Sequence, residues 1–325
     1  MDIVFLVIGL GLILWGANAL TDGASAIAKR WGVSDLIIGL TVVALGTSAP
    51  ELAISVISSI NGNAGLAIGN VVGSNIFNVL VIIGLTAIFR PIKVEKSNIT
   101  NDIPFVILSA LVILVMGNTG LLDGSSLNEI TRSDGILLLF FFLIFVFYTF
   151  AQAFKGNASD ASNTESPEQG EIKQMKMWKA VTFVLTGLAA LVFGGDRFVA
   201  GASGIAQSLG VSDAVIGLTI VAAGTSLPEL ATSVAAALKG KTGIALGNVI
   251  GSNIYNIFLV LGCSATIRPL PFGDINNVDL FVLTIGCILF WVFGWFFSHR
   301  TINRAEGAIL FYSYIGYIIY LILTV

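Results

Sequence analysis

The amino-acid sequence contains two copies of one pattern. The segment GVSDLIIGLTVVALGTSAPELAISV at 32–56 recurs as GVSDAVIGLTIVAAGTSLPELATSV at 210–234. A second segment, GLAIGNVVGSNIFNVLVIIG at 65–84, recurs as GIALGNVIGSNIYNIFLVLG at 243–262. The offset is 178 residues in both cases, from 32 to 210 and from 65 to 243. A shared offset indicates that about half the chain is duplicated, so the fold must be built from two related halves.

The composition places both halves in a lipid bilayer. The 325 residues are 56% hydrophobic and 11% charged, and the mean hydropathy is +0.93. A soluble domain carries about 25% charged residues, whereas apolar runs of about 20 residues match the thickness of a membrane. Because no basic patch is interleaved with aromatic residues, we expect no nucleic-acid partner. We also expect no resident cofactor and no obligate protein partner.

Apolar segments set the expected architecture. They fall at 3–21, 34–60, 66–88, 103–119 and 135–153, and then at 178–197, 212–238, 244–267, 278–298 and 307–325. We predict an all-α membrane protein with ten transmembrane helices: a first five-helix repeat (1–153), a polar cytoplasmic linker (154–177) and a second five-helix repeat (178–325). Since each half has an odd number of spans, the second half must enter the membrane from the opposite side. The two halves are therefore predicted to be inverted-topology repeats.

Lysine and arginine predict the orientation in the membrane. With the N-terminus on the outer side, only Arg132, Arg197 and Arg268 of the 16 basic residues fall in outer segments. Cytoplasmic loops of membrane proteins carry an excess of Lys and Arg. We therefore expect a multi-pass protein of the cell (inner or plasma) membrane with both termini extracytoplasmic.

The second span of each half contains a proline directly before a glutamate. Pro50 precedes Glu51 in GTSAPE, and Pro228 precedes Glu229 in GTSLPE. A proline inside a helix removes one hydrogen bond and displaces the carbonyl four residues before it, which belongs to Gly46 in the first half. Irregular backbone at membrane depth survives only where it is buried in protein or lines a wet cavity. We therefore expect both breaks to face a central polar site.

Oxygen-bearing groups follow one face of the second and third spans in both halves. Helical spacings of three and four residues align the members of each stripe. The stripes are Ala44, Thr47, Ser48, Glu51 and Ser55; Asn70, Ser74 and Asn78; Ala222, Thr225, Ser226, Glu229 and Ser233; and Asn248, Ser252 and Asn256. Asn75 and Asn253 lie off the stripes, where bonding to backbone is the alternative to ion binding. Oxygen ligands without thiolate or imidazole suit hard cations such as sodium and calcium.

The two intramembrane glutamates set the charge of this site. An uncompensated acidic side chain at the bilayer centre costs at least about 2.5–3.5 kcal/mol. One divalent cation neutralises the pair, as do two monovalent cations or two protons. Competition for the same two charges is a physical basis for exchange. Calcium, which takes about six to eight oxygens in flexible geometry, fits such a site better than magnesium.

These motifs resemble those of the sodium/calcium exchanger family, within the cation/calcium antiporter superfamily, in its prokaryotic type. The resemblance is carried by GTSAPE and GTSLPE together with GNVVGSNIFN and GNVIGSNIYN, and it extends over the whole chain. It implies secondary antiport of sodium against calcium by alternating access, with spans 2, 3, 7 and 8 as the core and spans 1 and 6 as a movable pair. The family's ion ligands map onto Ala44, Thr47, Ser48, Glu51, Ser74 and Asn78, and onto Ala222, Thr225, Ser226, Glu229 and Ser252.

Asn256 completes the expected site on the last stripe and departs from part of that family. Some prokaryotic relatives and the potassium-dependent exchangers carry an aspartate at this position. With an amide here, Glu51 and Glu229 alone carry the formal charge of the site. This favours plain sodium/calcium exchange over potassium-dependent exchange.

The same residues leave other functions open beside sodium/calcium antiport. Calcium/proton exchange would use the same carboxylates, but neutral Thr, Ser and Asn oxygens are ligands that sodium needs and a proton does not. A cation channel would use the same polar path without coupling. An enzyme is not expected, because the single histidine, His299, falls in an inner loop and the buried acids are not an aspartate pair.

Overall fold

The structure is a computed structural model that describes residues 1–124, 128–159, 175–209, 222–273, 275–297 and 300–324. These residues are almost entirely helical, with four strands of two residues each. The helical fold class predicted from the sequence is confirmed. His299 lies outside the described residues, as does the segment 210–221, where the second span of the second half was predicted to begin.

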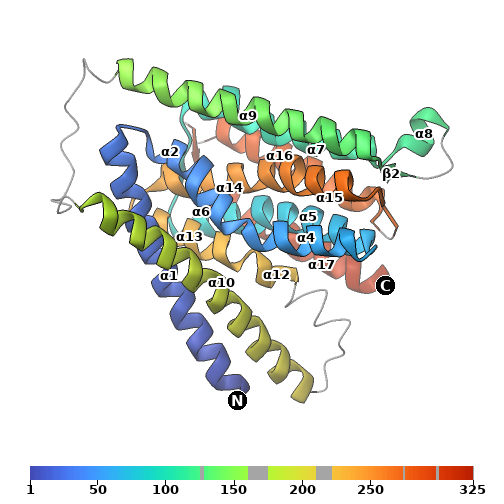
Figure 1. The fold of residues 1–325 in the computed structure, drawn as a ribbon, viewed down its shortest axis with the longest axis horizontal. Helices are drawn as coiled ribbons and strands as arrows, with labels where there is room; N and C mark the ends of the chain where they lie inside the picture. Colours follow the sequence, from blue (N-terminus) through green and yellow to red (C-terminus); the bar gives the residue numbers. More distant parts are fainter. Residues whose placement is uncertain (125–127, 160–174, 210–221, 274, 298–299, 325) are drawn as a thin grey trace.

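Helices α1 (Asp2–Trp31) and α10 (Met177–Ser208) begin the two halves and pack against each other. Figure 1 shows them side by side, running obliquely across the remaining helices. A Cβ on Gly16 would lie 2.8 Å from the carbonyl oxygen of Gly187, so only glycine permits this approach. The facing pairs are Gly9 with Gly194, Gly16 with Gly187, and Gly23 with Ala180. The numbers rise along one helix and fall along the other, so the two helices are antiparallel.

The second span of each half is interrupted where the prolines predict. In the first half, α2 (Asp35–Ile38), a π-helical segment (Gly39–Val43) and α3 (Ala44–Thr47) precede α4 (Ala49–Ile60), and the axis bends by 45° at the break. In the second half, α12 (Ala222–Thr225) is followed by α13 (Leu227–Leu238). The residues between them, Ser48 and Ser226, have nearly equal φ and ψ, −83° and 6° against −91° and 6°. The two breaks therefore share one backbone geometry.

The third spans form the centre of the molecule. They are α5 (Ala64–Phe77), a π-helical segment (Asn78–Ile82) and α6 (Ile83–Phe89), and α14 (Thr242–Ile254), a π-helical segment (Tyr255–Leu261) and α15 (Gly262–Ile267). Their apolar windows are 83% and 94% buried, against at most 50% for the other candidate spans. The wider π turns, which are often found at functional sites, begin at Asn78 and just before Asn256.

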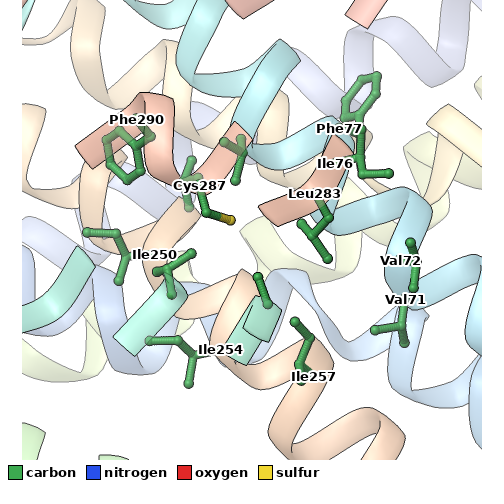
Figure 2. Packing of buried hydrophobic residues seen from close by; sticks show 14 of the residues in the cluster. Val71, Val72, Ile76, Phe77, Ile250, Ile254, Ile257, Leu283, Cys287 and Phe290 are labelled. Atoms are coloured by element: carbon green, nitrogen blue, oxygen red, sulfur yellow. The ribbon is translucent and has the colours of Figure 1, made fainter. Parts of the chain in front are cut away.

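Aliphatic side chains fill the space around this centre. Figure 2 shows the packing of α5 and α14 with α16 (Asn277–Phe296). The contributing side chains include Val71, Val72, Ile76, Ile250, Ile254, Leu283 and Cys287. Cys287 is a fully buried free thiol and acts here as a small packing residue.

The outer helices connect the two halves. They are α7 (Ile103–Met116), which follows a π-helical segment (Asn98–Asp102), the short α8 (Thr119–Asp123), α9 (Arg132–Ser159), α16 and α17 (Arg304–Thr324). Gly84 of α6 faces Gly307 of α17, and Gly262 of α15 faces Gly135 of α9. Each third span thus packs on the last helix of the other half.

Two short antiparallel strand pairs also join the halves. Strand β1 (Ile92–Lys93) pairs with β4 (Thr301–Ile302), and β2 (Glu129–Ile130) pairs with β3 (Leu270–Pro271). Each pair therefore takes one strand from either side of the predicted linker. These strands follow the third spans and precede the last helices, so they tie the ends of those helices together.

Eight helices among the described residues are long and apolar enough to cross a membrane, or nine if the bent pair of Asp35–Thr47 and Ala49–Ile60 is one span. The remaining predicted span, 212–238, corresponds to α12 and to α13, which is apolar but shorter, together with residues that lie outside the described part. Helix α9 continues to Ser159, into the range 154–177 predicted as linker.

Candidate cation site

Glu51 and Glu229 lie in the first turns of α4 and α13, directly after the two breaks, and both side chains are fully buried. The hydroxyl of Ser48 donates to Oε1 of Glu229 at 3.1 Å. The hydroxyl of Ser226 donates to Oε1 of Glu51 at 3.4 Å. Each break residue is therefore bonded to the carboxylate of the other half, which brings both glutamates to one place. The positive end of a helix dipole favours an anionic group at this position.

Several buried polar atoms around the carboxylates have no hydrogen-bond partner in the part of the chain that the structure describes. They are Oε2 of Glu51 and of Glu229, Oγ of Ser252, both amide atoms of Asn78 and Oδ1 of Asn256. A buried polar atom without a partner costs about 1–3 kcal/mol, and more when it is charged. All but the amide nitrogen of Asn78 are oxygens, so this set fits coordination of a hard cation.

The third spans contribute hydroxyl and amide groups to the same region. Ser74 of α5 donates to Oε1 of Glu51 at 3.5 Å. Its counterpart on α14, Ser252, is fully buried, as is Asn256 one turn further along the same span. Because Asn78 holds the equivalent position in the first half, each third span presents one hydroxyl and one amide.

Two asparagines hold the backbone behind the carboxylates. Asn70 donates to the carbonyl oxygen of Glu51 at 3.2 Å and to the hydroxyl of Ser55 at 2.9 Å. Asn248 makes the same two bonds in the second half, at 3.2 and 3.0 Å, and it also accepts from the hydroxyl of Thr47 at 3.0 Å. Both asparagines were predicted to lie on the stripes but were not predicted as ion ligands. The signal for a shared supporting role was their recurrence at the 178-residue offset.

The other predicted site residues lie just before the breaks. The carbonyl oxygen of Ala44 accepts from the backbone N–H of Ser48 at 3.0 Å and from the hydroxyl of Thr47 at 3.4 Å. Ala222 begins α12, and Thr225 ends it with a half-buried side chain. The structure thus brings the residues predicted in the two halves to the two breaks and to the adjoining third spans.

The two asparagines that lie off the stripes bond to backbone. Asn75 donates to the carbonyl oxygen of Asn253 at 3.1 Å, and Asn253 donates to the carbonyl oxygen of Val249 at 2.8 Å. The sequence left open whether Asn75 and Asn253 bind an ion or bond to backbone. In the structure, both side chains bond to backbone carbonyl groups.

A separate cavity of about 600 Å³ lies away from the glutamates. It opens near the start of α2, the segment before α7, the end of α9 and the start of α14. Asp35, Glu95, Asp102 and Tyr148 are among its lining residues, and none of the predicted site residues is. The buried carboxylates of Glu51 and Glu229 therefore lie outside this cavity.

Broken helices that carry two buried carboxylates and a shell of neutral oxygens define a polytopic membrane protein of the cation-transporter class. The family model described as sodium/calcium exchanger protein matches residues 1–151 and 179–323. The chain belongs to the sodium/calcium exchanger family, and the resemblance predicted from the sequence is confirmed.

Known proteins are similar to the chain over nearly its whole length. It is 39% identical to the putative antiporter CaxA of Alkalimonas amylolytica over 320 residues, which cover 97% of this chain and 96% of the relative. It is 33% identical to the sodium/calcium exchanger MaX1 of Methanosarcina acetivorans, with 99% and 98% covered. A solved structure of the sodium-calcium exchanger NCX_Mj matches with a TM-score of 0.82 and 33% identity over 98% of both chains.

Proposed function

We propose that the protein is a secondary antiporter that exchanges sodium for calcium by alternating access at the central site. The observation that carries this proposal is the crossed bonding of Ser48 to Glu229 and of Ser226 to Glu51. It brings one carboxylate from each half to a common point, where one calcium ion or two sodium ions balance the charge. Calcium and sodium cannot balance the same two carboxylate charges at the same time. The ions therefore compete for the site, and this competition is the basis of exchange. The relatives named as sodium/calcium exchangers support this choice of ions.

The proposed ion ligands come equally from the two halves. They are Ala44, Thr47, Ser48, Glu51, Ser74 and Asn78, with Ala222, Thr225, Ser226, Glu229, Ser252 and Asn256. Their support is the unpartnered buried oxygen atoms of Glu51, Glu229, Ser252 and Asn256, which a cation would satisfy. Calcium takes about six to eight oxygens, so neutral hydroxyl, amide and carbonyl groups must complete what two carboxylates begin.

We infer that the chain has ten spans arranged as two inverted repeats of five. The antiparallel packing of α1 on α10 supports this arrangement, since first helices related by an in-plane two-fold axis run in opposite directions. The reciprocal packing of Gly84 on Gly307 and of Gly262 on Gly135 supports it as well. The excess of basic residues on one side supports a cytoplasmic location for 154–177 and extracytoplasmic termini in the cell membrane.

We infer that α1 and α10 move together as the element that alternates access. Their glycine-lined contact lets them act as one body, and Figure 1 has them crossing the other helices obliquely. Helix α10 also contacts the site at both breaks: a Cβ on Gly46 would lie 2.6 Å from the side chain of Leu188, and Gly224 faces Val199. A sliding motion of α10 would therefore act on both breaks at once.

Ion fluxes into proteoliposomes test this function. Vesicles loaded with sodium should accumulate calcium when they are diluted into sodium-free medium, because outward sodium movement drives inward calcium movement. Sodium, potassium and pH gradients are imposed one at a time. Calcium uptake that follows the sodium gradient alone supports the proposal. Uptake that follows a pH gradient without sodium, that requires potassium, or that ignores every gradient would contradict plain sodium/calcium exchange.

A further inference from the structure

We propose that Asn75 is a positioning residue of the cation site, which fixes the side-chain amide of Asn256 so that its oxygen is the atom presented to the ion. Asn75 itself lies off the polar stripes and is not among the proposed ligands. The inference rests on the proposed function, because it concerns how one of the proposed ligands is oriented.

The orientation follows from one backbone carbonyl group. The side-chain nitrogen of Asn75 donates to the carbonyl oxygen of Asn253 at 3.1 Å. A carbonyl oxygen can only accept, so the NH₂ group of Asn75 must face it and Oδ1 must point the other way. That Oδ1 accepts from the side-chain nitrogen of Asn256 at 3.1 Å. The backbone of α14 therefore determines the orientation of both amides, which removes the usual freedom of an asparagine to turn over.

The result is a buried oxygen with no partner. Oδ1 of Asn256 is fully buried and accepts no hydrogen bond from any described residue. It lies one turn beyond Ser252, whose hydroxyl oxygen is also buried and unpartnered. If Asn256 turned over, its amide hydrogens would replace this oxygen, and a ligand for the cation would become a repelling dipole. The hydrogen bond between Asn256 and Oδ1 of Asn75 prevents the amide from turning over.

The two halves differ in this respect. The position equivalent to Asn75 in the second half is Asn253, and its amide donates to Val249 of its own helix at 2.8 Å. Asn253 therefore does not hold Asn78, and both amide atoms of Asn78 lack a partner among the described residues. The side-chain amide of Asn256 is oriented by its hydrogen bond to Asn75, whereas no described residue orients the amide of Asn78. The two amides of the site are consequently not equivalent, although the sequence repeats them.

Asn75→Ala and Asn253→Ala form a matched pair for the test. Both positions are buried asparagines on third spans, and Asn253→Ala keeps the backbone carbonyl that Asn75 needs. Losing one hydrogen bond that orients a ligand is expected to raise the calcium KM of sodium-driven uptake about tenfold in Asn75→Ala. Asn253→Ala should stay within about twofold of the unmodified protein. Equal values for the two variants would overturn the positioning role.

Asn75→Asp reports on the hydrogen-bond donor at this position through the pH dependence of uptake. A protonated aspartate can donate to the carbonyl of Asn253 and accept from Asn256, whereas an ionised aspartate can only accept. Uptake by Asn75→Asp, divided by uptake of the unmodified protein at the same pH, should therefore rise as the pH is lowered. A ratio that does not change with pH would overturn the proposal, even if Asn75→Ala does not fold.

Equilibrium binding of radioactive calcium to the purified full chain separates the two proposals. If the unmodified protein binds calcium but shows no sodium-driven uptake, the proposed exchange fails. In that case the weaker binding expected for Asn75→Ala, set against Asn253→Ala, still decides the role of Asn75.

Discussion

The hydroxyl of Thr47 donates to Oδ1 of Asn248 at 3.0 Å, across the boundary between the two halves of the chain. Asn248 in turn donates to the carbonyl oxygen of Glu229 at 3.2 Å. Two hydrogen bonds therefore link the end of α3 in the first half to the start of α13 in the second. The path connects one break to the backbone of Glu229 in the other half, which suits a site that both halves must open and close together.

The substitution Asn248→Ala should weaken exchange strongly. It removes the bonds to the Glu229 carbonyl and to Ser233, and it removes the nearer of the two acceptors of the Thr47 hydroxyl. With three bonds affected at about 0.5–1.5 kcal/mol each, we expect kcat/KM for calcium uptake to fall by about tenfold to a thousandfold. Asn63→Ala is the control, because the exposed side chain of Asn63 caps α5 by accepting from the backbone N–H of Leu66. Comparable losses in both variants would show that Asn248 has no special role.

Replacing either glutamate by glutamine should abolish sodium-driven calcium uptake. Glu51→Gln or Glu229→Gln removes one of the two charges that balance a calcium ion, and the loss is expected to exceed about a hundredfold. Glu95→Gln, an exposed acidic residue outside the site, should keep near-normal uptake and serves as the control. Initial uptake rates in proteoliposomes measure the effect. Uptake within about twofold of normal in Glu229→Gln would contradict a site of two equivalent carboxylates.

The parts of the site that the sequence predicted follow from the chemistry of single residues and from the repeat. Proline cannot donate a helical hydrogen bond, so Pro50 and Pro228 determine where both helices break. A charged group at membrane depth must be buried in protein, so Glu51 and Glu229 were identifiable as central residues before their surroundings were known. Repetition at a fixed offset then indicated that the two positions are related by symmetry.

What the sequence did not predict depends on contacts between distant segments. The crossed bonding of Ser48 to Glu229 needs the relative placement of the two halves, which local periodicity does not encode. The π-helical segment that begins at Asn78 adds an extra residue to a turn, and no composition rule distinguishes it from an α-helix. The strand pairs that join Ile92 to Ile302 and Ile130 to Leu270 are too short to show alternation.

The glycine-lined crossing of α1 and α10 should be intolerant of even one methyl group. A Cβ on Gly16 would lie 2.8 Å from the carbonyl oxygen of Gly187 and 3.0 Å from the backbone nitrogen of Leu191, neither of which is a flexible side chain. Gly16→Ala is therefore expected to cost about 1–3 kcal/mol and to lower the unfolding midpoint in detergent by roughly 3–10 °C. Gly11→Ala is the matched control on the same helix, because its Cβ would meet nothing within 4 Å.

Alanine is the better helix former, so Gly11→Ala should unfold at the same temperature as the unmodified protein or higher. The crossing of α1 and α10 is also the element proposed to move. For that reason Gly16→Ala should slow calcium uptake at temperatures where the protein is still folded. Equal unfolding midpoints and equal uptake rates in the two variants would mean that the crossing is looser than this packing requires.

Asn256→Asp should make exchange more sensitive to high pH. The amide of Asn256 donates to Oδ1 of Asn75 at 3.1 Å, and an ionised aspartate cannot make that bond. Ionisation would also add a third negative charge beside Glu51 and Glu229, and like charges so close together repel. A protonated aspartate avoids both effects, because it donates to Asn75 and carries no charge.

The ratio of uptake by Asn256→Asp to uptake by the unmodified protein should therefore fall as the pH rises. The uptake is measured with a fixed sodium gradient and with equal pH on both sides of the membrane. A ratio that is constant or rises with pH would show that the site tolerates a third negative charge beside Glu51 and Glu229, which contradicts this prediction.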